Sequence, residues 1–502
     1  MFSEKEIQQI EGRGSDLEQV KIQIQNFVDG FPYLEARRAA AIGDGILRFD
    51  DSQVRHYRDL YNEKSKSKKI IKFVPASGAA SRMFKELFAF LENGDFSNNK
   101  AVQKFVDGLE GFAFYGELKD RLADKGVDLK ETLANNKYEP IVAELLSSEG
   151  MDYGSLPKGL LKFHKYEDKS RTPVEEHFSE GASYAVSDGN KVYLHFTVSP
   201  EHQEKFERHI ADVKGLYENL TGVQYEVGFS QQKKSTDTIA VDMDNKPFLE
   251  EGEILFRPAG HGALLANLND LDGDVVFIKN IDNVVPDQLK EPTIVYKQVI
   301  GGLLIELQDK IFEMTEALSK GPTEQAIEEA GRFLAEKVNL KLPAQYNGFN
   351  KNEKVNYLLS KLDRPVRVCG IVKNTGEPGG GPFWVCDTDG TEAIQIGETA
   401  QIDLSNPVQA EMLKNSTHFS PTDIVCGIKD RHGKKYDLMK YRDPKTGFIT
   451  NKSKSGRDLK AQELPGLWNG SMANWNSVMV EVPLETFNPV KSVNDLLKPA
   501  HQ

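Results

Sequence analysis

An apolar run that leads through a turn of small residues into a helical pattern is the most constraining feature of this sequence. Residues 70–74 read Ile-Ile-Lys-Phe-Val, residues 75–83 read Pro-Ala-Ser-Gly-Ala-Ala-Ser-Arg-Met, and residues 84–88 read Phe-Lys-Glu-Leu-Phe. This order predicts a buried strand that delivers a tight turn to the start of a helix, where backbone N–H groups are free to bind an anion. Small side chains let a phosphate approach the main chain, and the guanidinium of Arg82 is suited to grip its oxygens.

Strand-like and helix-like runs alternate after this turn, which predicts a layered α/β sheet. The strand-like runs are residues 192–198, 225–229 and 275–278, and the helical patterns between and after them are residues 200–220 and 300–318. Further β-type runs follow at residues 366–372, 383–386, 393–396 and 478–482. The last third of the chain is therefore expected to be richer in strands.

A chain of 502 residues is expected to form more than one domain. The patterns predict a helical N-terminal region at 1–64, a core at 65–330 with a helical insertion at about 85–155, and a C-terminal region at 331–502 that completes the core. The glycine-rich loop at 376–382 is expected to be flexible, either as a mobile lid or as a plain hairpin. The segment 429–460 is polar, basic and turn-rich, and we expect it to be exposed.

Charge and composition restrict the class of protein. The net charge of −13 argues against a general binder of nucleic acids or anionic membranes, since both need a basic field. No apolar run approaches the roughly 20 residues that span a bilayer, and the start of the chain lacks the pattern of a signal peptide. The three cysteines are odd in number and lack metal-ligand spacing. These features predict a cytoplasmic protein with free thiols, as a monomer or a small homo-oligomer.

Two glycine-flanked segments offer further anion-binding chemistry. Lys158 lies between Pro157 and Gly159, before an apolar run, and is well placed to aim its ammonium at phosphates; a solvated loop lysine is the alternative. In residues 256–264, Gly260 and Gly262 flank His261 where a helix is expected to begin. Backbone amides there can face a base or a phosphate. The alternative is an ordinary helix-start turn in which His261 only hydrogen-bonds the main chain.

The remaining segments supply a carboxylate and amides. The apolar run 275–278 is followed by Asp282 and Asn283, which predicts a carboxylate at the carboxyl edge of a sheet, where α/β proteins bind ligands. Mg²⁺ takes hard oxygen ligands, often one or two carboxylates plus substrate phosphates, so Asp282 is the metal candidate. A turn-capping Asp is the alternative. Residues 467–475 and 486–491 place Asn469, Gly470 and Lys491 where amides and an ammonium can bind a sugar phosphate.

Taken in order, these segments resemble the nucleotidyltransferases that form nucleotide-sugars, and most of all the uridylyl-transferring branch of UDP-N-acetylhexosamine pyrophosphorylases and UTP–glucose-1-phosphate uridylyltransferases. The resemblance covers about residues 70–290 and 365–495. Its motifs correspond to residues 78–83 (small residues, then Ser-Arg-Met), 157–159 (Pro-Lys-Gly), 229–231 (Phe-Ser-Gln), 258–262 (Pro-x-Gly-x-Gly), 282–283 (Asp-Asn), 469–474 (Asn-rich) and 487–491 (Phe-x-Pro-x-Lys). The chain also resembles a bacterial family described only as of unknown function.

The resemblance implies a GT-A-like α/β/α core with a mixed sheet, of the nucleotide-diphospho-sugar transferase kind, in which a sugar-1-phosphate attacks the α-phosphorus of a nucleoside triphosphate, with Mg²⁺, and releases pyrophosphate. It implies that Arg82 and Lys158 are catalytic, that Asp282 binds the metal, and that Lys491 binds the sugar phosphate together with Asn469 and Gly470. The residues implied to bind the nucleotide are Ser77, Gly78, Ala79, Ala80, Ser81, Gln231, Gly260, His261 and Gly262.

The sequence departs from this family in several places. Ser77 and Ala80 stand where relatives often have glycine, and an alanine at positive φ would be strained. The interval between Arg82 and Lys158 is long, and Glu398 and Asp403 are only possible second carboxylates. Two alternatives therefore stay open. One is a GT-A glycosyltransferase, although its Asp-x-Asp motif at 242–244 or 387–389 has the character of a hairpin turn. The other is a nucleotide-sugar-binding protein without turnover. The phosphate-loop motif of kinases is absent from the sequence.

Overall fold

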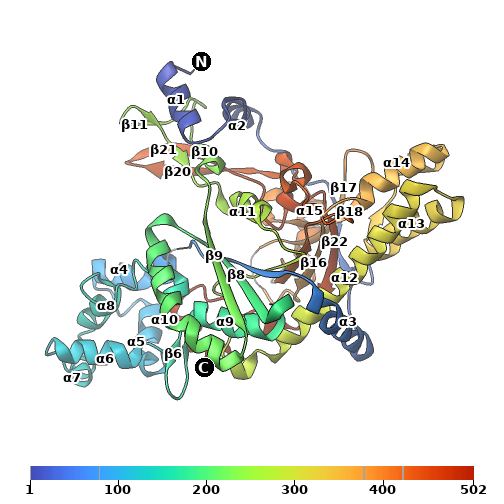
Figure 1. Ribbon diagram of the computed structural model, residues 1–502. Helices are drawn as coiled ribbons and strands as arrows, with labels where there is room; N and C mark the ends of the chain where they lie inside the picture. The colour runs from blue at the N-terminus through green and yellow to red at the C-terminus, as the bar shows by residue number, and fades with distance from the viewer. Residues whose placement is uncertain (1, 79, 377–378, 421–422) are drawn as a thin grey trace. The chain divides into compact units, whose positions relative to one another are not determined.

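The chain divides into two units, each assembled from three stretches of sequence. Unit 1 comprises Met1–Lys64, Gln232–Phe277 and Tyr296–Leu484, and unit 2 comprises Ser65–Gln231, Ile278–Val295 and Glu485–Gln502. The computed structural model (Figure 1) describes residues 2–78, 80–376, 379–420 and 423–502; Ala79, Glu377 and Pro378, which belong to segments singled out above, lie outside these ranges.

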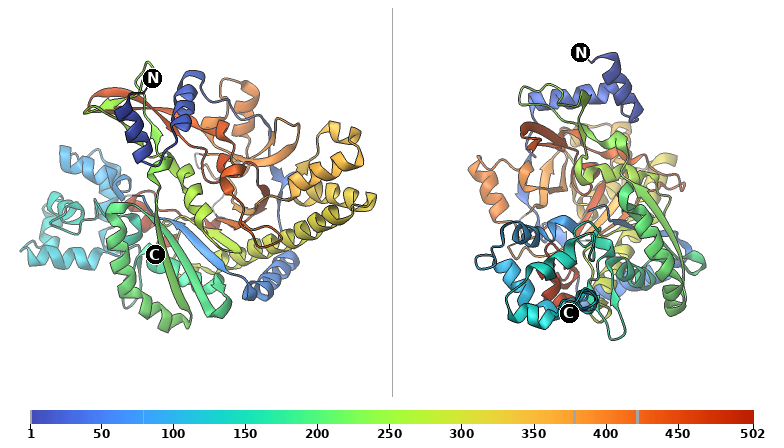
Figure 2. Two further views of the ribbon diagram at one scale, coloured as in Figure 1. Left: turned by 45° about the horizontal axis from the view of Figure 1, so that its top comes forward. Right: turned by 90° about the vertical axis from the view of Figure 1, so that its left-hand side faces the viewer.

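Three parallel strands form the sheet of unit 2. Strand β8 (Lys191–Val198) pairs in parallel with β4 (Ile70–Pro75) on one side and with β9 (Gln224–Gln231) on the other, and the three lie side by side in Figure 2. Short β7 (Val186–Ser187) pairs antiparallel with β8, and β5 (His164–Lys165) pairs with β6 (Ser170–Arg171). The register matches Pro75 with Thr197, and Thr197 with Ser230, so the carboxyl ends of the three parallel strands share one edge.

Helices α9 (Pro173–Tyr184) and α10 (Gln203–Thr221) pack on this sheet through a buried cluster that includes Val74, Phe178 and Phe196. Residues 85–146 form a separate group of helices with their own aromatic core, to which Phe84, Phe105 and Phe112 belong. These helices are α4 (Lys85–Asn93), α5 (Lys100–Asp107), α6 (Tyr115–Asp124), α7 (Leu129–Ala134) and α8 (Glu139–Leu146).

The strands of unit 1 form a mixed sheet and an antiparallel one. In the mixed sheet β16 pairs in parallel with β22 and antiparallel with β19, and β3 pairs with β22 and β2. The antiparallel sheet has the order β1-β17-β18-β15. The bounds are β1 (Ala36–Ala39), β2 (Ala41–Ile42), β3 (Gly45–Leu47), β15 (Leu340–Lys341), β16 (Val366–Ile371), β17 (Gly381–Cys386), β18 (Glu392–Gly397), β19 (Asp423–Gly427) and β22 (Asn476–Glu481).

Hairpins and helices complete unit 1. The hairpins are β10 (Thr238–Ile239) with β13 (Phe256–Arg257), β11 (Leu249–Glu250) with β12 (Glu253–Ile254), and β20 (Phe448–Lys454) with β21 (Arg457–Glu463). The helices are α1 (Glu4–Gly12), α2 (Leu17–Asp29), α3 (Asp51–Lys64), α11 (Leu264–Asp270), α13 (Glu324–Lys337), α14 (Lys351–Leu362) and α15 (Pro407–Lys414). Strand β14 (Val275–Ile278) and helix α12 (Glu291–Lys320) run through the points where the chain passes between units.

The mixed α/β architecture predicted from the alternating patterns is confirmed, and the strand-like runs coincide with β4, β8, β9, β14, β16, β17, β18 and β22. The expectation of helices alone before residue 64 is wrong for residues 36–47, which form β1, β2 and β3. These short segments become strands because distant partners pair with them: Ala39 lies opposite Phe383, and Ile46 opposite Met479. Such tertiary pairing overrides local preference.

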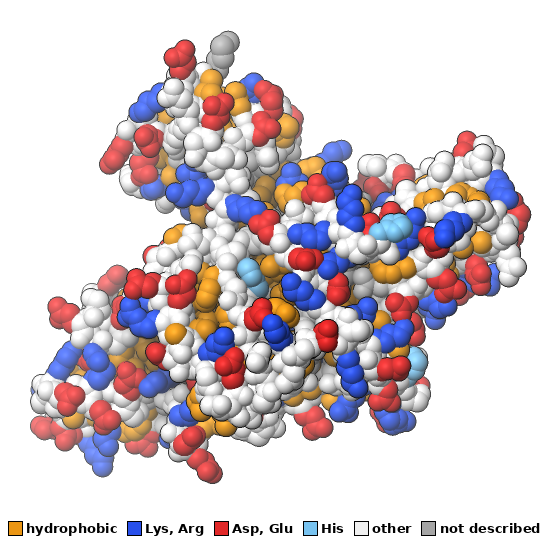
Figure 3. All heavy atoms as spheres, viewed as in Figure 1, with side chains coloured by type: hydrophobic (Ala, Val, Ile, Leu, Met, Phe, Trp, Pro, Cys, Tyr) orange, Lys and Arg blue, Asp and Glu red, His pale blue; other side chains and the backbone are white. Residues whose placement is uncertain are grey.

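The surface carries both signs of charge, and Figure 3 shows Lys and Arg side chains interspersed with Asp and Glu over the visible face. Within the described ranges, no helix combines the length and the apolar character needed to cross a membrane. The three cysteines are free thiols, and Cys369 and Cys426 are buried.

Candidate functional site

The turn that follows β4 joins the sheet of unit 2 to helix α4. The Ala76 N–H donates to the Thr197 carbonyl (2.9 Å), which fixes the start of the turn beside the end of β8. Gly78, Ser81 and Arg82 are exposed, and Ser77 is half-buried. Helix α4 begins directly after Phe84, and no described side chain caps its start. The predicted strand, turn and uncapped helix start are therefore confirmed as structure.

Ala80 differs from its neighbours in this turn. Its N–H donates to the Leu156 carbonyl (3.1 Å) and its side chain is fully buried in the aromatic core of the helical group. Ala80 is not among the described residues with positive φ, so an alanine is unstrained at this position. Because its N–H is already used within the protein, this residue ties the turn to the segment that precedes Lys158.

Lys158 begins a short 3₁₀ turn, Lys158–Leu160, whose geometry depends on Gly159. A Cβ on Gly159 would lie 2.9 Å from two ring carbons of Phe206 and 3.2 Å from Cγ1 of Ile281. Only a glycine lets the backbone approach this closely without displacing its neighbours. The glycine of the Pro-Lys-Gly segment therefore positions Lys158 against the strand end that carries Asp282.

Lys158 and Asp282 form an ion pair at the carboxyl edge of the sheet. Nζ of Lys158 lies 2.8 Å from Oδ2 of Asp282, and it also donates to the Val490 carbonyl at 2.7 Å. Both side chains retain some exposure, 17% for Lys158 and 18% for Asp282. Asp282 and Val490, which lie 124 and 332 positions after Lys158 in the sequence, thus meet at its ammonium group.

The segment after β14 is held in place by β4 and by the late Phe-x-Pro-x-Lys motif. The Ile281 N–H donates to the Pro75 carbonyl (3.3 Å), so the next residue, Asp282, lies beside the end of β4, the strand that leads into the small-residue turn. Asn283 is buried, and its Oδ1 accepts from the Asn488 N–H (2.8 Å). Unit 2 therefore brings together residues 75–83, 156–160, 281–283 and 486–493.

Two other predicted residues of unit 2 are exposed. Gln231 lies at the carboxyl end of β9 and donates from Nε2 to Oε1 of Gln203 at 2.8 Å. The Lys491 N–H donates to Oδ2 of Asp495 at 2.9 Å. Both residues belong to the same unit as the Lys158–Asp282 pair, and their contacts with ligands stay predictions.

A buried ionic cluster lies behind the strand ends that carry the turn and Asp282. Glu180 of α9 is completely buried and accepts from Nζ of Lys72 on β4 (2.9 Å) and from Nζ of Lys279 after β14 (2.8 Å). Burial by itself raises the pKa of Glu180, but the two lysine charges outweigh it and hold the pKa well below the usual range. One carboxylate thus joins the two chain segments that lead into the site.

His177, one turn away on α9, extends this cluster to the backbone beside Asp282. Its Nε2 lies 3.2 Å from the Ile281 carbonyl, and its own carbonyl accepts from Lys72. Burial, together with the charge of Lys72, holds the pKa of His177 well below its usual value. The imidazole is therefore neutral at physiological pH, and its Nε2–H donates to Ile281.

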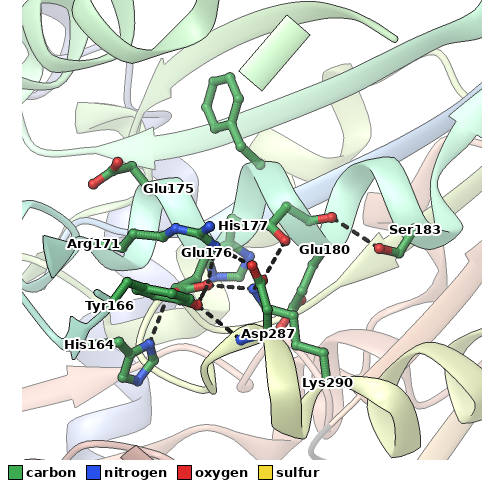
Figure 4. A network of polar contacts seen from close by, with 12 residues as sticks. His164, Tyr166, Arg171, Glu175, Glu176, His177, Glu180, Ser183, Asp287 and Lys290 are labelled. Atoms are coloured by element: carbon green, nitrogen blue, oxygen red, sulfur yellow. Dashed lines mark hydrogen bonds and ion pairs between the residues drawn. The ribbon is translucent and has the colours of Figure 1, made fainter. Parts of the chain in front are cut away.

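A second group of polar contacts surrounds Glu176 on the same helix (Figure 4). Its Oε1 lies 2.9 Å from Nδ1 of His164 and 3.0 Å from the Tyr166 hydroxyl, and its other oxygen binds Lys290. Nε2 of His164 lies 3.0 Å from Nδ1 of His501, and the two rings stack. Burial, aided by the charge of His164, lowers the pKa of His501 to about 3.

In unit 1, the glycine-histidine segment meets the Asn-rich segment. Nδ1 of His261 accepts from the Leu467 N–H (3.0 Å), so its Nε2 carries the proton and donates to Oε1 of Glu398 (3.2 Å). Oε1 of Glu398 also accepts from Nδ2 of Asn469 at 2.8 Å. The Trp468 ring stacks on His261 with centroids 4.5 Å apart.

Glycine is required at the two positions beside His261 for different structural reasons. Gly260 has φ +74°, a conformation that favours glycine, and a Cβ on Gly262 would collide with the Pro465 carbonyl. Helix α11 begins at Leu264, as the pattern predicts. His261 also makes the main-chain hydrogen bond that an ordinary helix-start turn predicts. Its contact with a nucleotide base stays a prediction.

Both Asp-x-Asp sequences form turns, as predicted. Oδ1 of Asp242 accepts from the Asp244 and Lys246 N–H groups, and Asn245 has φ +66°. Residues 387–391 connect β17 to β18, where Gly390 has φ +81°.

Asp282 is chemically suited to Mg²⁺, although no group of three or more metal-ligating side chains occurs within the described ranges. Lys158 occupies Oδ2 of Asp282, and among the described residues no donor binds Oδ1. A single carboxylate suffices when substrate phosphates and waters supply the other ligands. The donor set therefore fits a magnesium ion that arrives with a nucleotide.

Several residues of these clusters had no motif in the sequence. Glu180, His177 and Trp468 belong to ordinary helical or loop patterns, and Glu398 was only a possible metal ligand. A usable signal did exist for the ionic cluster, because Lys72 interrupts an apolar run and Lys279 directly follows another. A lysine inside a buried strand requires a buried partner.

The sequence matches one family over nearly its whole length: residues 3–502 match the family described as "Domain of unknown function (DUF4301)". The predicted membership of a family of unknown function is thereby confirmed. No curated protein matches the sequence.

Solved structures of pyrophosphorylases are similar to this chain. The uridine diphosphate N-acetylglucosamine pyrophosphorylase from Trypanosoma brucei is 12% identical, with a TM-score of 0.47, over 91% of this chain and 69% of that one. A UDP-glucose phosphorylase from the same organism is also 12% identical, with a TM-score of 0.44, over 98% and 77%. A variant of UDP-glucose pyrophosphorylase from Leishmania major is 11% identical, with a TM-score of 0.42, over 98% and 77%. Likeness at this level carries no argument about activity.

Proposed function

The chain belongs to the DUF4301 family, and we propose that it is a nucleotidyltransferase that transfers a nucleoside monophosphate, with uridylyl as the first candidate, from a nucleoside triphosphate to a sugar-1-phosphate. The observation that carries this proposal is the cluster in unit 2. An exposed small-residue turn at an uncapped helix start, a lysine and a carboxylate lie on contiguous segments there.

The reaction needs alignment and charge neutralisation more than a protein nucleophile. An oxygen of the sugar-1-phosphate attacks the α-phosphorus, the bond from that phosphorus to the bridging oxygen breaks, and pyrophosphate leaves with the electron pair. Both reactants are anions, so positioned cations and N–H donors lower the barrier. In this proposal, the N–H groups of Gly78 and Ser81 bind the triphosphate, and Arg82 binds the leaving pyrophosphate.

Lys158 stabilises charge on the α-phosphate. An ammonium has three N–H donors, and two of them bind Asp282 and the Val490 carbonyl. The third is available to a phosphate oxygen. Asp282 would hold Mg²⁺, which when bound would neutralise phosphate charge. Within unit 2, Gln231 is proposed to contact the base and Lys491 the sugar phosphate. In this proposal the unit 2 core adopts the GT-A arrangement.

The test is a screen for pyrophosphate release from nucleoside triphosphates and sugar-1-phosphates in the presence of Mg²⁺. Lys158→Ala and Asp282→Asn should each reduce turnover by about 10²-fold or more, because each removes a charge aligned with the transition state. Lys162→Ala is a matched control, since Lys162 lies on the same segment and pairs with the exposed Glu117. Unchanged rates in the Lys158 or Asp282 variant would remove that residue from the mechanism.

One alternative, binding of a nucleotide-sugar without turnover, is distinguished by the same material. Calorimetry that detects nucleotide binding, combined with no exchange of labelled pyrophosphate into the triphosphate, would favour it. Exchange that depends on Lys158 would favour the transferase.

A further inference from the structure

A cavity of 490 Å³ lies within unit 1, formed entirely by residues of that unit. The loop before β1, the β17–β18 hairpin and residues 442–446 and 469–475 line it. Its volume falls within the range of about 300–1,000 Å³ typical of small-molecule sites.

Two guanidinium groups in the wall of this cavity form no ion pair with a described carboxylate. Arg442 is half-buried and, among the described residues, makes no hydrogen bond or ion pair. Arg364 donates only to neutral acceptors, the carbonyls of Ser360 (2.7 Å) and Asn474 (3.4 Å). Burial lowers the pKa of both residues; the charges of Asp387 and Asp389 oppose this for Arg364, whereas burial alone acts on Arg442.

The acids of the cavity wall are already engaged. Oδ1 of Asp387 accepts from the Thr388 N–H, and Oδ1 of Asp443 accepts from the Lys445 N–H. Glu35 lies 3.6 Å from Arg37. In contrast to Arg442, the other buried cation of the wall, Lys361, is neutralised by Asp389 at 2.7 Å. These hydrogen bonds leave the carboxylate charges in place, but no described carboxylate pairs with Arg442, so its guanidinium has no counter-charge among the described residues.

Two neutral polar groups of the wall also lack partners. The indole N–H of Trp475, a residue that is 4% exposed, has none among the described residues, and neither has Oε1 of Gln395. Nε2 of Gln395 donates to the Ala473 carbonyl, which fixes the orientation of the amide. A buried donor and a buried acceptor without partners cost free energy, and a ligand that bears oxygens and hydroxyls would satisfy both.

From these observations we propose that the cavity of unit 1 binds a small hydroxylated molecule that carries one oxyanion, a carboxylate or a phosphate. The oxyanion lies on the forked donors of Arg442 and Arg364, and hydroxyl groups meet Trp475 and Gln395. Asn469 and Gly470 belong to the same wall. The proposal depends on no step of the transfer reaction, because neither Lys158 nor Asp282 takes part in it.

The experiment measures binding of three probes that share a sugar ring: glucose 1-phosphate, glucuronate and uncharged glucose. With ¹⁵N-labelled tryptophan, the three indole signals of the chain report binding, and Trp475→Phe identifies the signal of Trp475. We expect glucose 1-phosphate, glucuronate or both to shift that signal and glucose to leave it unchanged. Which charged probe binds distinguishes a phosphate ligand from a carboxylate one.

Arg442→Gln should weaken binding of the charged probe by about tenfold or more, the effect of losing a charged hydrogen bond. Lys440→Gln is the matched control, since Lys440 is on the same turn with a side chain that is 78% exposed. If Arg442→Gln does not fold, Arg442→Lys keeps the charge but loses the fork and should still weaken binding. Equal binding of glucose and the charged probes, equal affinity in the Arg442 variant that folds, or no binding of either charged probe would overturn the proposal.

Discussion

Replacement of Glu180 by glutamine tests the buried ionic cluster behind the candidate site. The side chains of Glu180 and Lys72 are 0% exposed, and that of Lys279 is 1% exposed. Glutamine has nearly the same shape but no charge. The Glu180→Gln variant would therefore remove the negative charge that two buried ammonium groups share.

Removal of one partner from a buried ion pair costs about 3–5 kcal/mol in the free energy of unfolding. The loss should lie toward the upper end of this range, because one carboxylate neutralises two lysines. The folded-state pKa of Glu180 lies below the usual value, so its stabilisation is present at neutral pH and is lost as pH falls below about 4.3. The variant should accordingly lack this part of the acid destabilisation.

Hydrogen exchange read by mass spectrometry is the suitable assay, because all three tryptophans lie in unit 1 and their fluorescence does not report on unit 2. A loss of 3–5 kcal/mol corresponds to exchange about 10²–10⁴-fold faster in peptides that contain β4 and β8. Glu226→Gln is the control: its pair with Lys191 is exposed on both sides and should be worth less than about 1 kcal/mol. If the two variants exchange at similar rates, the cluster does not stabilise these strands.

Three further outcomes are expected. Gly159→Ala should lower the free energy of unfolding in urea by about 1–3 kcal/mol, because the new Cβ would press on Phe206 and Ile281. Gly215→Ala is the control, since a Cβ there meets nothing within 4 Å and should not destabilise the fold. Equal unfolding midpoints of the two variants would contradict the packing argument. The folded-state pKa of His501 is about 3, below an unfolded value of about 6.5, so its stabilisation is lost as pH falls below 6.5. His501→Gln should make the loss of unfolding free energy between pH 7.5 and pH 5 smaller by about 2 kcal/mol, and an unchanged pH slope would refute this. Chelation of Mg²⁺ should abolish pyrophosphate release and re-addition should restore it; full activity in the chelator would exclude a divalent ion from the reaction.

Eight strands, β4, β8, β9, β14, β16, β17, β18 and β22, were predictable because their apolar runs can be identified without tertiary information. The Lys158–Asp282 pair was predictable only as two separate candidates, since no local pattern shows that residues 124 positions apart share a hydrogen bond. Strands β1 to β3 could not be predicted, because their pairing partners decide their conformation.

Other parts of the sites lay beyond sequence reasoning for a different reason. Glu180 and Arg442 have the same residue types as many solvated surface charges. Their importance comes from burial and from the presence or absence of a counter-charge, which depend on the whole fold. By contrast, the Pro-Lys-Gly segment was identified from the sequence, but the packing against Phe206 and Ile281 that requires glycine at position 159 was not.

The assembly of unit 2 from three separate stretches has a consequence for synthesis on the ribosome. Residues 485–502 provide the Val490 carbonyl that holds Lys158, and they add Val490, Val493 and Leu496 to the aromatic core. A nascent chain that has exposed only residues 65–231 therefore lacks part of this core and one acceptor of the key ammonium. Native closure of unit 2 must wait until translation has passed residue 490, so its earlier stretches, residues 65–231 and 278–295, need protection from aggregation until then.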